Sequence, residues 1–290
     1  MAAIVFDNFS YAYDGATKAL DGIELTVARG SFTVVAGPSG AGKTTLCLAA
    51  CGVVPHYFGG SMAGSVQVAG VNTAACSMGE LAAHVGTVLE DYESQLVTMT
   101  VAEEVAFALE NRGIEHGKIA RRIAEVLAKV GLPGFEDREV GTLSGGQKQR
   151  LAIASVLAAR PGILVLDEPA SALDPEGAED LYALLAGLNR EYGLAVLVVE
   201  HDLARVLAYA DQLVVLAGGR VACQGRPGEV LPAIWRQTEL AAMVPPLWQI
   251  KLGLEERLGT DFAAWRHEDE AAAELGGFIG ARRREGTKSA

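Results

Sequence analysis

The chain has no long hydrophobic run, although half of its 290 residues are hydrophobic. Its apolar stretches, such as 162–166 and 194–199, are short and are followed by acidic or polar residues. A membrane-spanning helix needs about 20 apolar residues. The first residues, with Asp7 close to the start, also lack the basic region and apolar core of a signal peptide. The sequence therefore predicts a chain that stays in the cytosol, where it could lie against a membrane without crossing it.

Positive charge and cysteine are also scarce. The formal net charge is −12, which argues against a nucleic-acid partner because such proteins usually carry a basic surface. The four cysteines, Cys47, Cys51, Cys76 and Cys223, form no C-x-x-C pair. Cys47 and Cys51 lie four residues apart on an expected helix, so a redox or metal pair is conceivable. We favour small buried thiols in a reducing compartment, and the fold needs no disulfide.

Strand-like and helical segments alternate along the chain and predict an α/β fold. Residues 3–35 have the pattern of short strands, and helical periodicity covers 100–132, which we interpret as an inserted helical subdomain. The other expected elements are strand 31–36, helix 44–50, strands 64–70 and 85–89, helix 147–159, strand 163–166, helix 175–192 and strand 195–199. This order favours a mainly parallel sheet.

The pattern changes after residue 226. We expect one helix over 231–244, ended by Pro245 and Pro246. A second helix would carry on one face Leu247, Ile250, Leu254 and Leu258. The rest, from Glu268, ends in three arginines at 282–284, which we interpret as a solvated terminus rather than a lipid contact.

A glycine-rich loop at 37–44, Gly-Pro-Ser-Gly-Ala-Gly-Lys-Thr, joins an expected strand to an expected helix. Glycine lets backbone N–H groups approach phosphate oxygens, and the following helix points its positive end at the anion. Lys43 would reach the β- and γ-phosphates, and the Thr44 hydroxyl would bind Mg²⁺.

Two further motifs follow the loop. Residues 143–150, Leu-Ser-Gly-Gly-Gln-Lys-Gln-Arg, open a helix, so Ser144, Gly145 and Gly146 present N–H groups to a second anion. Asp167 and Glu168 end an apolar strand, which delivers both carboxylates to the edge where such sheets bind ligands. We expect Asp167 to hold Mg²⁺ and Glu168 to act as general base on the water that attacks the γ-phosphate.

The three motifs, in this order, resemble the ATP-binding cassette (ABC) ATPases over residues 3 to about 225. The resemblance implies a P-loop NTPase cassette with a mainly parallel core, an antiparallel β subdomain, an inserted helical subdomain and a C-terminal helical extension. It also implies that the signature at 143–150 binds nucleotide held by a second cassette, identical or a related paralogue. The implied domains are 1–225, with the helical subdomain at about 91–145, and 226–290.

The resemblance assigns further residues. His201 stands at the position of the switch histidine, segment 171–174 resembles the D-loop, and Tyr13 matches the aromatic residue that stacks on adenine, with Tyr11 as an alternative. The implied ATP-binding set is Tyr13, Gly37, Pro38, Ser39, Gly40, Ala41, Gly42, Lys43, Thr44, Thr45, Ser144, Gly145, Gly146, Gln147 and Asp174. Glu168 and His201 are the implied catalytic residues.

One position departs from the family pattern. The family places a glutamine after the strand at 85–89, whereas this chain has Glu90, and Gln95 is too far along to replace it simply. We hypothesise that Glu90 keeps the metal role with altered coupling, so the implied Mg²⁺ ligands are Thr44, Glu90 and Asp167.

The segments at 91–96 and 100–111 look like those of energy-coupling factor ATPases, which energise uptake of vitamins and metal ions. That resemblance implies an importer ATPase at the cytoplasmic face of the membrane. It would act with a transmembrane coupling subunit and a substrate-binding membrane component. An exporter ATPase and, less favoured, a soluble cassette outside transport are the alternatives.

Overall fold

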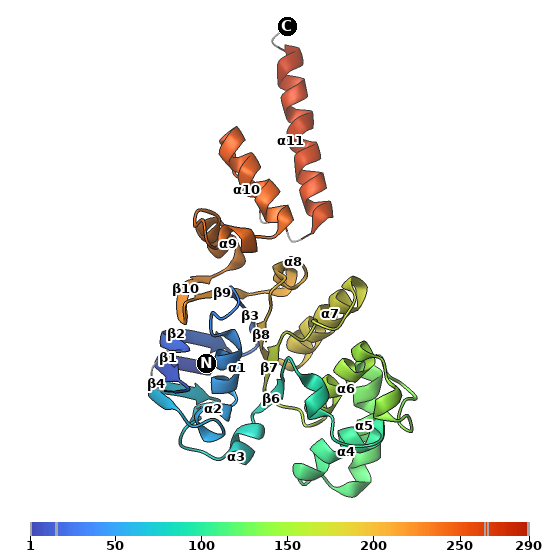
Figure 1. Ribbon diagram of the computed structural model, residues 1–290. Helices are drawn as coiled ribbons and strands as arrows, with labels where there is room; N and C mark the ends of the chain where they lie inside the picture. The colour runs from blue at the N-terminus through green and yellow to red at the C-terminus, as the bar shows by residue number, and fades with distance from the viewer. Residues whose placement is uncertain (1, 15–16, 264, 266, 289–290) are drawn as a thin grey trace.

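The computed structural model describes residues 2–14, 17–263, 265 and 267–288, with side chains described as far as residue 280. Figure 1 shows two neighbouring sheets in the lower half of the molecule, with helices around them. The C-terminal helices project away from the sheets at the top. Among the described residues, no helix is long and apolar enough to cross a membrane.

The larger sheet is mainly parallel, as the sequence predicts. Its strands, in spatial order, are β10 (Arg220–Gly225), β9 (Gln212–Ala217), β3 (Phe32–Ala36), β8 (Ala195–Val199), β7 (Ile163–Asp167) and β6 (Val85–Val88). All neighbours run parallel except β10 and β9. Every residue of β3, β7 and β8 is buried, as expected for strands covered on both faces.

Alternate residues of these strands face two separate cores. Val34 and Val196 belong to one core, with residues of α6 (Gly145–Ala158) and α7 (Pro175–Tyr192). Val35 belongs to the other, with residues of α1 (Lys43–Ala50) and of the second sheet. The side-chain period of two therefore places helices on both faces of the sheet.

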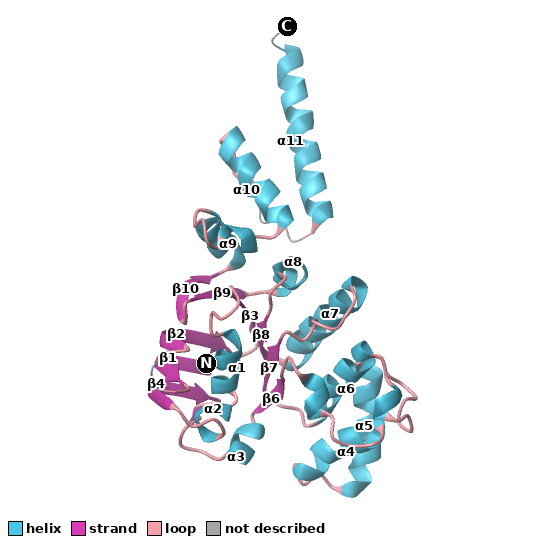
Figure 2. Ribbon diagram, viewed as in Figure 1, coloured by secondary structure: helices cyan, strands magenta, loops and turns pink. Residues whose placement is uncertain are grey.

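The second sheet is antiparallel and covers α1 (Figure 2). Its strands, in spatial order, are β2 (Leu20–Ala28), β1 (Ala2–Ala12), β4 (Ser61–Val68) and β5 (Val71–Asn72). The short helices α2 (Val53–His56) and α3 (Met78–Ala82) flank it.

The helical stretch expected over 100–132 is confirmed as α4 (Val101–Asn111) and α5 (His116–Lys129). With α6 they form a separate group of helices at the lower right of Figure 1. The remaining short helices of the cassette are α8 (Leu203–Val206) and the 3₁₀ turns η1 (Tyr92–Gln95), η2 (Val140–Thr142) and η3 (Leu207–Tyr209).

The single helix expected over 231–244 is wrong. The chain instead forms α9 (Pro227–Trp235), turns, and then a 3₁₀ turn, η4 (Ala241–Met243). Leu240 and Val244, on either side of this 3₁₀ turn, are both buried in the main core. The sequence signal for an earlier start is Pro227, since proline suits the first helical turn.

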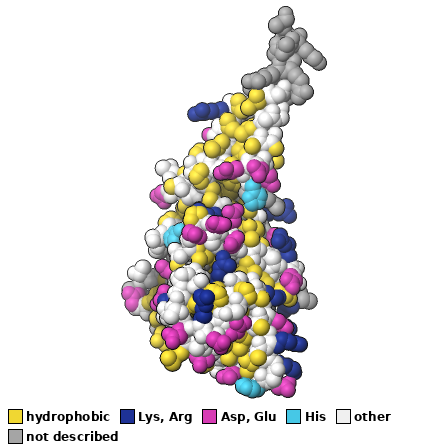
Figure 3. Space-filling view, turned by 90° about the vertical axis from the view of Figure 1, so that its right-hand side faces the viewer, with side chains coloured by type: hydrophobic (Ala, Val, Ile, Leu, Met, Phe, Trp, Pro, Cys, Tyr) yellow, Lys and Arg dark blue, Asp and Glu magenta, His cyan; other side chains and the backbone are white. Residues whose placement is uncertain are grey.

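The expected second helix is present as α10 (Pro246–Leu258), and α11 (Glu268–Lys288) follows it. Leu247, Leu254 and Leu258 pack on a small core of Phe262 and Trp265, whereas Ile250 is exposed and does not share their face. Figure 3 shows hydrophobic side chains gathered on this upper part of the molecule. The side chains of the arginines at 282–284 lie outside the described part.

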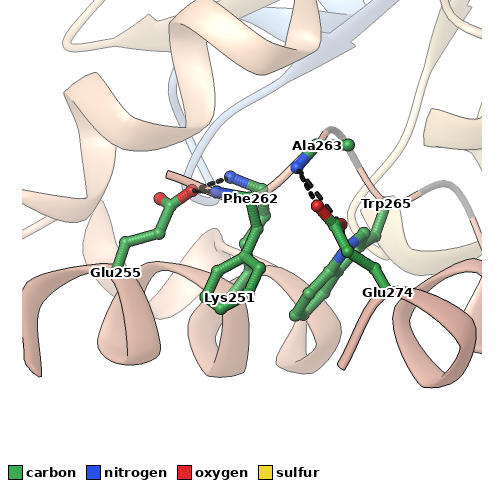
Figure 4. Close-up of polar contacts among 6 residues, drawn as sticks. All are labelled: Lys251, Glu255, Phe262, Ala263, Trp265 and Glu274. Atoms are coloured by element: carbon green, nitrogen blue, oxygen red, sulfur yellow. Dashed lines mark hydrogen bonds and ion pairs between the residues drawn. The ribbon is translucent and has the colours of Figure 1, made fainter. Parts of the chain in front are cut away.

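Two glutamates hold the connection between α10 and α11 (Figure 4). Glu255 accepts hydrogen bonds from the buried Lys251 ammonium and from the Phe262 N–H, the latter at 2.8 Å. Glu274 on α11 accepts from the Ala263 N–H at 3.0 Å and from the Trp265 indole N–H at 2.6 Å. Each glutamate accepts a hydrogen bond from a backbone N–H group of the connection, so side chains of both helices hold Phe262 and Ala263 in place.

We expect the substitution Gly64→Ala to destabilise the antiparallel sheet. Gly64 has φ +75°, and a Cβ there would lie 2.2 Å from the Asn8 carbonyl oxygen, where the β1–β4 register shifts. Gly70→Ala is the matched control, because Gly70 has φ +84° but open space around it. Gly64→Ala should lower the free energy of unfolding by about 2 kcal/mol or more in urea, and Gly70→Ala by about 1 kcal/mol. Equal losses would contradict the steric argument.

Candidate functional site

Strand β3 leads into the loop at 37–42, and α1 begins directly after it at Lys43. A Cβ at Gly37 would lie 2.4 Å from the Leu216 carbonyl oxygen, and one at Gly42 would lie 2.5 Å from the Ala19 carbonyl oxygen. Gly40 has φ +76° and open space. Thus Gly37 and Gly42 are required by contacts within the chain itself, a reason that differs from the phosphate approach expected from the sequence.

The Lys43 ammonium is buried inside the loop. Its Nζ donates hydrogen bonds to the carbonyl oxygens of Gly37 (2.9 Å) and Pro38 (3.2 Å). Burial lowers the pKa of Lys43, while the nearby carboxylates of Glu168 and Asp167 act in the opposite direction. A cation is therefore held beside the loop's N–H groups, as anion binding requires.

A cavity of about 330 Å³ opens over this loop. Its walls include the loop, Glu90 from the end of β6, Glu168 from the end of β7 and His201 from the end of β8. The lining residues are Ala19, Ser39, Gly40, Gly42, Lys43, Thr44, Thr45, Glu90, Glu168 and His201. The carboxyl ends of the parallel strands thus meet here, as the sequence predicts.

Asp167 is buried at the end of β7, and neither of its carboxylate oxygens has a hydrogen-bond partner among the described residues. The pKa of Asp167 is raised to about 6, chiefly by burial and also by the charges of Glu168 and Glu90, while the nearby Thr44 hydroxyl and Lys43 ammonium act in the opposite direction. An unpartnered buried carboxylate is costly unless it is neutralised or binds a cation. This donor set of carboxylate oxygens with the Thr44 hydroxyl fits Mg²⁺, which prefers oxygen ligands.

Glu168 and His201 lie in direct contact. The distance from His201 Nε2 to Glu168 Oε1 is 2.8 Å, and the histidine side chain is about half exposed at the cavity. Glu168 adopts φ +52°, an unusual conformation for a residue other than glycine, and its N–H donates to the Val199 carbonyl. The backbone therefore aims the Glu168 side chain out of the strand and toward His201.

Glu90 lines the cavity, whereas Gln95 does not. The Gln95 side chain accepts a hydrogen bond from the Leu89 N–H (2.9 Å) and donates one to the Thr87 carbonyl (3.3 Å). Gln95 therefore secures the end of β6, from which Glu90 extends. The sequence carries no signal for this role, because a glutamine seven residues beyond the strand has no fixed partner.

Tyr13 and Tyr11 occupy different environments. Tyr13 is 43% exposed, and its hydroxyl lies 3.2 Å from Thr45 Oγ1 beside the cavity. Tyr11 is 1% exposed and donates its hydroxyl proton to the Gly59 carbonyl. Tyr11 is thus a core residue, so Tyr13 is the tyrosine of this pair that a nucleotide base could reach.

The signature residues do not line this cavity. Ser144 and Gln147 cap the start of α6, since Ser144 Oγ accepts from the Gln147 N–H and Gln147 Oε1 accepts from the Ser144 N–H. Asp174 caps α7 by accepting from the Gly177 N–H at 2.8 Å. The N-termini of α1 and α6, both of the kind that binds anions, are therefore separate in this chain. The structure does not bring Ser144–Gln147 or Asp174 to the loop at 37–42.

The cysteines fit a structural role. Cys47 and Cys51 are buried, and burial raises the pKa of both thiols, that of Cys51 to about 12. Thiols with such high pKa values are poor nucleophiles and poor metal ligands. Cys76 and Cys223 are only half-buried.

Comparisons with known proteins agree with this geometry. The family model for "ABC transporter" matches residues 20–171. A protein of Pyrococcus abyssi, named only as an ABC transporter ATP-binding protein, is 42% identical over 95% of this chain and 98% of its own length. The energy-coupling factor transporter ATP-binding protein EcfA1 of Lactobacillus delbrueckii subsp. bulgaricus is 36% identical over 88% of this chain and 89% of its own.

A solved structure agrees as well. CbiO1 from Clostridium perfringens, described as part of the ABC transporter complex cbiONQ, superimposes with a TM-score of 0.73. It is 30% identical and covers 89% of this chain and 97% of its own. The chain belongs to the ABC transporter family of ATP-binding cassettes, which hydrolyse ATP, form dimers and act with membrane components.

We expect Asp167→Asn to stabilise the nucleotide-free protein at high pH. The folded state raises the pKa of Asp167 from its ordinary 3.8 to about 6, so it favours the protonated acid. That preference stabilises the fold at low pH and is lost as pH rises through about 6. At about pH 8, the neutral asparagine should raise the free energy of unfolding by on the order of 2 kcal/mol.

The measurement is urea unfolding without Mg²⁺ at several pH values. The exposed Asp137 provides the control Asp137→Asn, which should show no such gain. A gain for Asp167→Asn that did not grow between about pH 4 and pH 7 would contradict the argument.

Glu90→Gln tests the departure from the family pattern. The substitution removes a charged oxygen ligand and lowers the negative charge near Asp167. We expect the Mg²⁺ concentration for half-maximal ATPase activity to rise about threefold or more, and stimulation by a membrane partner to change. Glu239→Gln, at an exposed glutamate outside the cavity lining, is the control. If both Mg²⁺ dependence and stimulation stayed the same, the metal role of Glu90 would be wrong.

Proposed function

We propose that this protein is the ATP-binding and ATP-hydrolysing subunit that energises membrane import of a small solute, with a vitamin or metal ion favoured. ATP-driven pairing of two cassettes would supply the work. The observation that carries the hydrolytic part is the 2.8 Å contact between His201 and Glu168 beside the loop cavity. In this assignment, Glu168 accepts a proton from the attacking water and His201 orients Glu168 and the γ-phosphate.

The nucleotide would lie across the loop cavity with its base on Tyr13. Lys43 and the loop N–H groups would bind the phosphates, and Thr45 lies between the loop and Tyr13. Thr44, Glu90 and Asp167 would hold Mg²⁺. When bound, Mg²⁺ would neutralise phosphate charge and stabilise the developing charge on the leaving group.

A second cassette would complete the site. The signature helix start at Ser144–Gln147 and the D-loop residue Asp174 lie outside the cavity of their own chain. Facing the loop of another cassette, the signature could bind the γ-phosphate there. Both helix starts are complete in this chain, so an identical partner suffices chemically, and Glu90 also allows a related but different partner.

An exposed apolar loop supports docking on a membrane subunit. Met99 is 76% exposed and Val97 is 65% exposed. The buried Glu104 carboxylate orders this loop by accepting from the N–H groups of Val97 (2.9 Å) and Thr98 (3.0 Å). The loop is therefore held with its apolar side chains outward, a feature typical of an interaction surface.

Two relatives support the resemblance of segments 91–96 and 100–111 to energy-coupling factor ATPases, on which the importer assignment rests. EcfA1 is an energy-coupling factor ATPase by name, and CbiO1 is part of the cbiONQ complex. We therefore propose that the protein acts with a transmembrane coupling subunit and a substrate-binding membrane component. It would lie peripherally at the cytoplasmic face of the membrane. We also propose the division into a cassette, 1–225 with helices inserted at about 91–145, and an extension, 226–290, that includes α9, α10 and α11.

The test is a pull-down of tagged Glu168→Gln protein from detergent-solubilised native membranes with MgATP. Loss of the proposed base should slow hydrolysis by orders of magnitude and preserve ATP-induced dimers. Mass spectrometry should then identify a small membrane subunit with a substrate-binding membrane protein. A second variant, Glu168→Gln with Met99→Asp, should keep the dimer and lose the membrane proteins.

The other outcomes are equally informative. A membrane partner without a substrate-binding component would favour an exporter, and only soluble or ribosomal partners would remove the chain from transport. Near-normal turnover in Glu168→Gln would remove Glu168 from the general-base role.

A further inference from the structure

A buried acid–phenol pair lies behind the proposed catalytic residues. Glu200 follows β8 and immediately precedes His201, and it is 7% exposed. Tyr182, from the middle of α7, is 1% exposed and donates its hydroxyl proton to Glu200 Oε1. This hydrogen bond connects a helix on one face of the sheet to the strand end that carries His201.

The second carboxylate oxygen contacts His201 itself. Glu200 Oε2 accepts a hydrogen bond from the His201 backbone N–H at 3.3 Å. The Glu200 N–H in turn donates to the Val35 carbonyl at 3.0 Å, which ties the same segment to β3. The contacts thus run from Tyr182 through Glu200 and the His201 backbone to the His201 side chain, which meets Glu168 at 2.8 Å.

The surroundings make an ionised Glu200 unfavourable. Burial raises the pKa of Glu200 to about 7, and the charge of Glu168 adds to the effect. Burial and the Glu200 charge also raise the pKa of Tyr182 well above its usual value. From the following segment, Asp202 and Arg205 face Tyr182 with opposite charges. Leucine at position 200 would avoid this cost, so the hydrogen bonds are the feature that a carboxylate provides here.

We propose that Glu200 is a positioning residue for ATP hydrolysis: held by Tyr182, it fixes the His201 backbone so that the imidazole meets Glu168. This inference rests on the proposed roles of Glu168 and His201. The Tyr182–Glu200 hydrogen bond also connects His201 to α7, and α7 begins next to Asp174 in the D-loop-like segment. A shift of α7 upon cassette pairing would therefore reach His201 through Tyr182 and Glu200.

The required property of Glu200 is hydrogen bonding rather than charge. A glutamine can accept from the His201 N–H through its oxygen and donate to the Tyr182 hydroxyl through its amide, because a hydroxyl both donates and accepts. A leucine can do neither. Glu200→Gln should therefore preserve the positioning, and Glu200→Leu should abolish it.

The experiment compares steady-state ATPase kinetics of Glu200→Leu, Glu200→Gln and Tyr182→Phe in the full-length protein. We expect Glu200→Leu to lower kcat about tenfold or more, with the KM for ATP within about twofold of the parent. Glu200→Gln should recover most of that loss. Combined with Glu168→Gln, Glu200→Leu should still form ATP-induced dimers, since Lys43 and the loop N–H groups that would bind the phosphates are left unchanged.

Asp202→Asn is the matched control, because Asp202 neighbours His201 but caps α8 through the Ala204 N–H instead. It should leave kcat within about twofold of the parent. An equal loss in this control, equal losses in the leucine and glutamine variants, or a loss confined to KM would each overturn the proposal.

Tyr182→Phe keeps the test decisive if Glu200→Leu does not fold. Removal of one donor should lower kcat by a smaller factor, and the double variant Tyr182→Phe with Glu200→Ala should lose less than the product of the two single losses, because both residues act in one network. Independent, multiplicative effects would overturn the proposal. Failure of Glu168→Gln to slow hydrolysis would instead contradict the proposed function, so the two failures are distinguishable.

Discussion

The site depends on one constraint, the parallel pairing of β3, β7 and β8 in the centre of the larger sheet. Parallel strands place their carboxyl ends at the same edge. The phosphate loop follows β3, Asp167 and Glu168 end or follow β7, and His201 follows β8. The register Leu166–Val198 and Val34–Val198 brings these ends into line. Because all three strands are buried on both faces, a slip by one residue would exchange the two cores and displace the proposed catalytic residues.

The same edge concentrates charge that the fold alone does not balance. Glu90, Asp167 and Glu168 all act on the buried Lys43 ammonium, and Asp167 has no hydrogen-bond partner among the described side chains and backbone groups. Such a site lowers the stability of the protein without ligand, and the proposed binding of Mg²⁺ and nucleotide would restore that stability. The raised pKa of Asp167 reflects the same cost, because burial disfavours the ionised carboxylate that a cation would need.

Sequence predicted those parts of the structure whose signals are local. The bounds of α7 follow from the Asp174 cap, Pro175 in the first turn and Gly193 with φ +63° after the last, and all three can be read from residue type. The C-terminal end of α9 could not be obtained in this way, because Trp235 donates its indole N–H to Glu256 on another helix. Gln95 and Tyr182 were also missed, since their partners are chosen by the tertiary fold.

The segment between β6 and α4 contacts the strand end beside the cavity, the signature helix α6 and the exposed apolar loop at 97–99. Gln95 secures the strand end that carries Glu90, while Glu93 forms an ion pair with Lys148 of the signature helix at 2.9 Å. Two residues further on, Val97 and Thr98 are held by the buried Glu104 on α4. Residues 93–98 are thus held at three points, namely the end of β6 beside the cavity, the signature helix and α4.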